Sequence, residues 1–153
     1  MALILMGMAL AGCNIGVRSD AAKGVEAFLT AVRTGNRPAF EAVIDRDKLR
    51  ADLRGQLIEL GREQGLEVEG GASDFALDRM ISPEAFRPLQ AELGPVRPKA
   101  LAATIKVVNR HRVCLLDAPD SERCVLTFAK EKAAWKLVGM RARDPKLAVA
   151  LSD

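Results

Sequence analysis

The chain has 153 residues, of which 49% are hydrophobic and 28% charged, so it can form one domain that buries a sizeable core. Its 23 basic and 20 acidic residues give a net charge of +3 at pH 7, which is too small and too dispersed to indicate a nucleic-acid-binding protein. With no Tyr, one Trp and five Phe, the chain has few aromatic side chains that could stack on bases or sugars, and aliphatic residues must fill the core.

The first thirteen residues form an uncharged apolar stretch that ends in Leu10-Ala11-Gly12-Cys13. This ending resembles the lipobox of bacterial lipoproteins, in which the Cys thiol receives a diacylglyceryl group, a peptidase cuts before the Cys, and the new amine is acylated. Small residues before the Cys give the peptidase access to the backbone, and a thiolate is the nucleophile that takes the lipid. About ten apolar residues are too few to span a bilayer, which needs roughly twenty. We therefore predict a signal peptide at residues 1–12, lipidation at Cys13 and a tether at residues 13–19.

An ordinary short apolar N-terminus is the alternative to this prediction. No Lys or Arg precedes the apolar run, although lipoprotein signals normally begin with a basic region; a start codon placed too far downstream would explain the difference. In the lipoprotein family an Asp directly after the Cys commonly retains the protein at the inner membrane. Asn14 at this position favours the periplasmic side of the outer membrane over the inner membrane. The expected partners are the membrane, through the N-terminal lipid, and an envelope protein.

Helical patterns dominate the first part of the single domain expected over residues 20–153. Apolar side chains recur every three or four residues in segments that begin at polar cap residues. A helix capped by Ser19 or Asp20 is expected to end at Gly35, and Ser82-Pro83-Glu84 is a strong start signal for the last helix. Pro88 would remove an interior hydrogen bond, so this last helix is expected to be brief or kinked. The other expected caps are Asn36, Asp45 and Ser73.

From Ala100 onward the pattern changes to that of strands. Arg97-Pro98-Lys99 is expected to extend the chain toward them, and β-branched residues are frequent from Thr104 to Leu116. Residues 123–130 and 135–140 alternate well enough to be two further strands. The prediction is an antiparallel meander of three strands, or four if Asn109 to His111 breaks the first. Helices followed by such a meander indicate an α+β domain, with N-terminal helices packed on a C-terminal antiparallel sheet.

Two cysteines, Cys114 and Cys124, remain once Cys13 is assigned to the lipid. An even pair in an oxidising compartment predicts one disulfide. A turn centred on Pro119 would place the two residues directly opposite each other in a hairpin, with Cα atoms about 4.5 to 5.5 Å apart, which a disulfide accepts. The alternative is a pair of buried free thiols in a cytosolic protein.

The helical segments and the last strand also resemble known domains. Gly35-Asn36, Ala39-Phe40 and the stretch from Val43 to Leu53, followed by Ser82-Pro83-Glu84, are similar to a bacterial domain of unknown function numbered 2939. Trp135-Lys136-Leu137-Val138-Gly139 is similar to the last strand of cystatin-like and nuclear-transport-factor-two-like folds, in which helices lie across a curved antiparallel sheet. The resemblance implies a fold and no catalytic residues, because such folds carry many functions.

No pattern of catalytic or metal-binding residues stands out. His111, the single His, lies between two Arg residues, where we expect an exposed strand or turn residue and not a ligand or general base. Asp45, Asp47 and Asp52 cluster near one helix start, where acidic residues stabilise the helix electrostatically. Acid/base work by a pair of these carboxylates is the alternative, and the helix start is the simpler interpretation. We therefore predict no enzyme activity, no cofactor and no metal site.

Arg46, Arg50 and Arg54 recur at every fourth position and share one helical face. A solvated face is the simplest interpretation, and contact with lipid phosphates or an acidic partner is the alternative. Together the patterns favour a membrane-anchored, non-enzymatic binding or scaffold domain of the bacterial envelope. A small-ligand pocket between the helices and the concave face of the sheet is the competing hypothesis.

Overall fold

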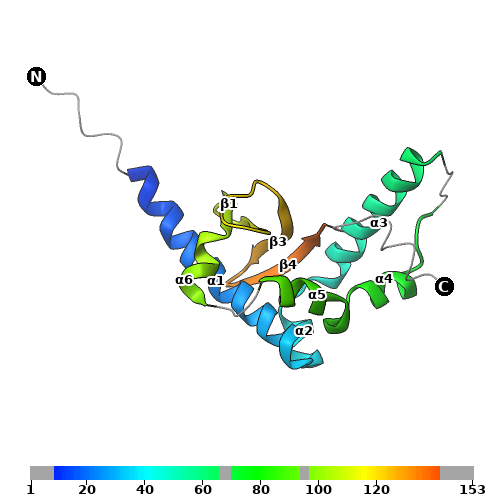
Figure 1. Cartoon of the computed structure of the whole chain (residues 1–153), viewed down its shortest axis with the longest axis horizontal. Helices are drawn as coiled ribbons and strands as arrows, with labels where there is room; N and C mark the ends of the chain where they lie inside the picture. The colour runs from blue at the N-terminus through cyan, green and yellow to red at the C-terminus, as the bar shows by residue number, and fades with distance from the viewer. Residues whose placement is uncertain (1–8, 66–69, 94–96, 142–153) are drawn as a thin grey trace, which may run out of the picture.

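The computed structural model describes residues 9–65, 70–93 and 97–141, and most of the predicted signal peptide, residues 1–8, lies outside them. Helices precede strands in these ranges, and the strands form one antiparallel sheet in the order β1-β2-β3-β4 (Figure 1). The predicted α+β class and the four-strand alternative are confirmed. The elements are α1 Ala9–Thr34, α2 Arg37–Ala42, α3 Arg46–Glu63, α4 Asp74–Met80, α5 Pro83–Leu93, α6 Pro98–Ala103, β1 Ile105–Asn109, β2 Arg112–Leu116, β3 Cys124–Glu131 and β4 Ala134–Met140.

Side-chain caps begin most of the helices where the sequence predicted them. The carboxamide of Asn36 accepts a hydrogen bond from the Ala39 amide at 3.1 Å, and Asp45 and Ser73 do the same at the starts of α3 and α4. The Ser82 hydroxyl accepts from the amide of Ala85 at 3.2 Å at the start of α5. These bonds satisfy amides that the first helical turn leaves without partners. Pro88 does not end α5, which continues to Leu93.

Two helix predictions were wrong. α1 begins at Ala9 and not at Asp20, so residues 13–19 are helical. The C-terminal part of α1 is held by the core, and no residue between Cys13 and Asp20 stops the helix from continuing toward the N-terminus. Arg97 to Lys99 leads into α6 and not directly into a strand. Arg97 is extended, as a residue before Pro tends to be, and Pro98 occupies the first turn, where its missing N–H does no harm.

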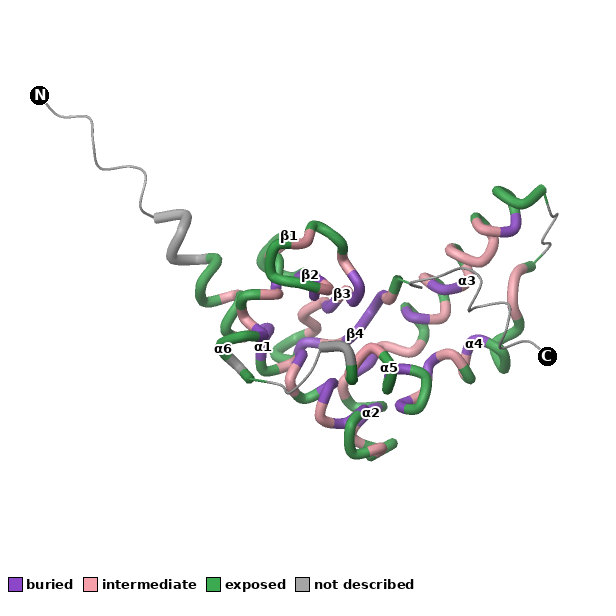
Figure 2. Tube along the Cα trace, in the orientation of Figure 1, coloured by how far each residue is buried: buried purple, intermediate pink, exposed green. Residues whose placement is uncertain are grey.

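Four Phe rings fill the space between the helices and the sheet. Phe28 of α1 contacts Phe40, Phe86 and Phe128, with ring centroids 5.8, 5.1 and 5.8 Å apart, and each of the four side chains is at most 2% exposed. Figure 2 shows the buried residues along the inward sides of the helices and strands. This aromatic and aliphatic packing occupies the place where the sequence allowed for a ligand pocket.

α1 approaches the start of β4 closely at Gly24. A Cβ atom added to Gly24 would lie 2.5 Å from the Cβ of Trp135, so only a residue without a side chain fits there. One turn earlier, Asp20 accepts hydrogen bonds from the indole of Trp135 at 2.9 Å and from the Lys130 ammonium at 2.6 Å. These donors, Lys130 first, hold the pKa of the Asp20 carboxyl below its usual range. Asp20 therefore fastens α1 to the sheet, and it is not the helix cap that the sequence suggested.

The two edges of the sheet differ. At the β4 edge, Leu137 exchanges backbone hydrogen bonds of 2.9 Å with Val43 and Asp45, and Ile44 forms an isolated parallel bridge with Leu137. β1 forms the other edge and contains a register irregularity between Val107 and Asn109. The segment between α2 and α3 thus lies along β4 and places α3 beside that strand.

Candidate functional site

A hollow of about 300 Å³ opens beside the ends of β3 and β4, on the side of the sheet where α3 lies. Its walls combine acidic, amide, hydroxyl and apolar side chains from the helix and both strands. The lining residues are Asp52, Gln56, Cys124, Val125, Thr127, Met140 and Arg141. The hollow is at the small end of the volumes typical of ligand sites.

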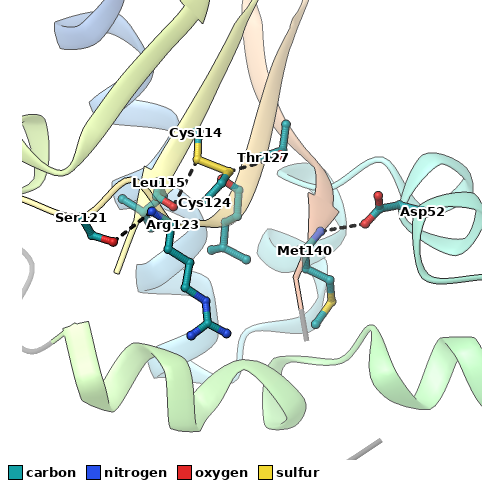
Figure 3. Close-up of a disulfide and its surroundings, with 9 residues drawn as sticks. Asp52, Cys114, Leu115, Ser121, Arg123, Cys124, Thr127 and Met140 are labelled. Atoms are coloured by element: carbon teal, nitrogen blue, oxygen red, sulfur yellow. Dashed lines mark hydrogen bonds between the residues drawn. A yellow bond between two sulfur atoms is a disulfide. The ribbon is translucent and has the colours of Figure 1, made fainter. Parts of the chain in front are cut away.

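Asp52 and Gln56 are one helical turn apart on α3 and hold the end of β4. One carboxylate oxygen of Asp52 accepts a hydrogen bond from the Met140 amide at 3.0 Å (Figure 3). The same oxygen accepts from the Gln56 carboxamide at 2.9 Å. The same Gln56 nitrogen donates to the carbonyl oxygen of Met140. Because both side chains bond to the strand or to each other, their main effect is to fasten α3 to the sheet.

The predicted bond between Cys114 and Cys124 is present (Figure 3), and Cys124 lines this hollow. The Cα atoms of the two residues are 5.6 Å apart, within the range for disulfides. The predicted register was wrong, however, because Cys114 faces Thr127 and Cys124 faces Leu116.

A bulge at Val125 explains how the bond forms in this register. Leu115 pairs with Leu126 while Leu116 pairs with Cys124, so Val125 is an extra residue in β3. Side chains alternate between faces along a strand, and one extra residue reverses the face of everything beyond it. The bulge thus turns Cys124 to the face that carries Cys114 and Thr127, and the Cys124 sulfur lies 3.6 Å from the Thr127 hydroxyl oxygen.

The arginine row on α3 binds to α4. Arg50 donates two hydrogen bonds to the carboxylate of Asp78, at 2.7 and 2.8 Å, and Arg46 donates to the same group at 2.9 Å. Arg54 pairs with Asp74 at 2.5 Å. The pKa of Asp78 lies below its usual range, mainly because of the hydrogen bond from Arg50. The three guanidinium groups therefore hold two helices together.

We call this set of ion pairs between α3 and α4 the clamp. The sequence contains a signal for the clamp that the helical pattern alone did not reveal. Asp74 and Asp78 are four residues apart, as Arg50 and Arg54 are, so the two pairs can match across adjacent helices. Asp47 pairs weakly with Arg50, at 3.5 Å, and Asp52 points to β4, so the expected acidic cluster does not converge on one point.

The remaining candidate residues occupy simple positions. His111 is exposed in the turn between β1 and β2. Within the residues that the structure describes, no three His, Cys, Asp or Glu side chains are grouped as metal ligands would be. Cys13 belongs to α1, and the structure describes its backbone but not its side chain. None of the described helices is long and apolar enough to cross a membrane.

Comparison with protein-family models, curated proteins and solved structures gives no match. The resemblances noted from the sequence therefore stay predictions. A function for the chain must be inferred from its own residues and their geometry.

Proposed function

We propose that this protein is a lipid-anchored lipoprotein of the bacterial envelope, in which a small α+β domain acts by binding and not by catalysis. The placement of the three cysteines carries the proposal. Cys114 and Cys124 are joined to each other, whereas Cys13 follows an apolar stretch and lies directly before an exposed part of α1. A disulfide is also typical of proteins that fold outside the cytosol.

The part of α1 that directly follows Cys13 suits an anchored domain. Asn14, Ile15 and Gly16 are exposed; counted from Asn14, where the described side chains of α1 begin, Val17 is the first to contact the core and Ala21 is the first that is buried. The eight-residue step from Cys13 to Ala21 corresponds to about 12 Å of helix. A lipid on Cys13 would therefore leave the domain free to fold beside the membrane, on the periplasmic side of the outer membrane as Asn14 suggests.

Metabolic labelling tests the anchor directly. Cells that express the chain are fed a palmitate analogue, and the label on the purified protein is measured. We expect Cys13→Ser to abolish the label and to move the protein out of the membrane fraction, since stable anchoring takes more than one acyl chain. A double variant, Cys114→Ser with Cys124→Ser, is the control and keeps the label. Unchanged labelling of Cys13→Ser would rule out the proposed anchor.

The hollow beside the disulfide favours a second candidate function, the binding of a small polar molecule. Thr127 and Arg141 line the hollow, and Arg141 is exposed. Two-dimensional NMR with acetate and with ethylamine tests this role, using Thr127→Leu to fill the space. Shifts limited to the lining residues and lost in Thr127→Leu would support it, and the absence of such shifts would reject it.

A further inference from the structure

One end of the sheet gathers a group of positive charges. The β1–β2 and β3–β4 turns lie side by side there, because the Lys130 amide donates to the carbonyl oxygen of His111 at 2.9 Å and Arg112 pairs with Ala129. Asp20 of α1 lies at the same end, where it accepts hydrogen bonds from Lys130 and Trp135. We call this region the basic end; its cations are Arg18, Lys23, Arg110, Arg112, Lys130 and Lys132.

The charge of the basic end contrasts with that of the opposite end. In residues 18–23, 110–112 and 130–132 these six cations are accompanied by two acids, Asp20 and Glu131, which gives these segments a net charge of +4 where the whole chain has +3. Glu131 also pairs with Lys48 and Lys136. At the other end, the β2–β3 loop contains Asp117, Asp120 and Glu122 against a single base, Arg123. The sheet is therefore electrically polarised along its strands, and an anionic surface would attract it in one orientation.

Most cations of the basic end are available for an external partner. Arg18, Arg110, Arg112 and Lys132 are exposed and form no ion pair with any residue that the structure describes. The arginine row of α3 is different, since each of its guanidinium groups is already bound to a carboxylate of this chain. The headgroup contact that the sequence allowed for the arginine row thus fits the basic end better.

α1 leaves the domain at the basic end. Its residues before Val17 extend away from the sheet and the other helices (Figure 1). The seven-residue step from Cys13 to Asp20 spans about 10 Å of helix. This length is close to the Debye length at 0.1 M salt, so charges at the basic end would still interact with a surface at Cys13.

We propose that the basic end docks on an anionic phospholipid surface. This inference rests on the proposed anchor at Cys13, which would hold the basic end against the membrane and direct the acidic β2–β3 loop away from it. Each basic side chain near an anionic membrane strengthens binding about fivefold. The removal of three such charges is then expected to weaken binding about a hundredfold.

Vesicle flotation with the full chain carrying Cys13→Ser tests the docking without the lipid. Vesicles of phosphatidylglycerol mixed with phosphatidylethanolamine are compared with pure phosphatidylcholine vesicles at low salt. The test variant combines Arg110→Gln, Arg112→Gln and Lys132→Gln. The matched control combines Arg33→Gln, Arg79→Gln and Arg87→Gln, which remove the same charge from exposed positions on α1, α4 and α5. The apolar N-terminus is common to all the proteins, and circular dichroism verifies that each variant is folded.

We expect the parent to float with the anionic vesicles, the test variant to bind about a hundredfold more weakly, and the control to bind nearly as the parent does. Equal losses of vesicle binding in the two variants would show a general charge effect and overturn the proposal. Failure of the parent protein to bind anionic vesicles would also overturn it. The anchor is judged separately by labelling of Cys13 in cells. Failed labelling together with selective flotation would reject the anchor and keep the basic end as a membrane-binding surface.

Discussion

Replacing Gly24 by Ala is expected to destabilise the protein, although the same change usually stabilises a helix. Ala is favoured over Gly in helix interiors by about 0.8 to 1 kcal/mol. At Gly24, however, the new Cβ would lie 2.5 Å from the Cβ of Trp135, well inside the roughly 3.5 to 4 Å at which carbon atoms pack best.

The clash cannot be relieved by a side-chain rotation. The Cβ of Trp135 is fixed to the backbone of β4, and the backbone oxygen of Trp135 is also only 3.4 Å from the added atom. Either α1 or β4 must move, so we take the upper part of the usual cost of overpacking, about 2 to 3 kcal/mol. After subtraction of the helix-propensity gain, we expect a net loss of about 1 to 2 kcal/mol in the free energy of unfolding.

Urea denaturation followed by tryptophan fluorescence measures this loss. The signal comes from the altered contact, because Trp135 is the one Trp of the chain. Gly55→Ala is the matched control. Gly55 lies within α3 with no atom close to an added Cβ, so this variant is expected to gain about 0.5 to 1 kcal/mol. If Gly24→Ala proves as stable as the parent, or if the two variants change in the same direction, the close packing of α1 on β4 is refuted.

Three further predictions concern the clamp, the disulfide and pH. Asp78→Ala removes the carboxylate shared by two arginines, and we expect a loss of about 1 to 2 kcal/mol by urea denaturation; a change below about 0.3 kcal/mol would contradict the clamp. Reduction of the bond between Cys114 and Cys124, which are 10 residues apart, is expected to cost about 2 to 3 kcal/mol, seen as a lower urea midpoint with reductant; equal midpoints would exclude this contribution. The lowered pKa values of Asp20 and Asp78 contribute stability that is complete above their unfolded pKa near 4 and is lost as pH falls through the lower folded values. Unfolding followed from about pH 5 to pH 2 is expected to show this decline, with a shallower slope in Asp20→Asn and Asp78→Asn; equal slopes would remove the assignment.

Local signals in the sequence predicted much of the fold. Asn36, Asp45 and Ser73 cap helices as expected, because a cap depends only on residues three positions away. Strand residues were recognised by their composition, and the cysteine count predicted the disulfide. The fold class followed from the order of these local elements.

Features that depend on contacts between distant segments were not predictable in the same way. The bulge at Val125 shifts the register of β2 on β3, and no residue pattern in the β2–β3 loop predicts it. Asp20 looked like a cap because its partners, Lys130 and Trp135, lie more than a hundred residues later in the sequence. Asp52 was likewise assigned to a helix start, although it bonds to the end of β4.

The bridge between Ile44 and Leu137 affects how the folded protein can associate with itself. Unpaired strand edges recruit strands from other molecules, and this is a common route to aggregation. Here the β4 edge is already bonded to the segment before α3, so β1 is the edge left for another strand. β1 has five residues, an irregular register near its end and an exposed Lys106, features that natural sheets use against edge pairing. Concentrated solutions of the native protein are therefore expected to resist growth of the sheet from one molecule to the next.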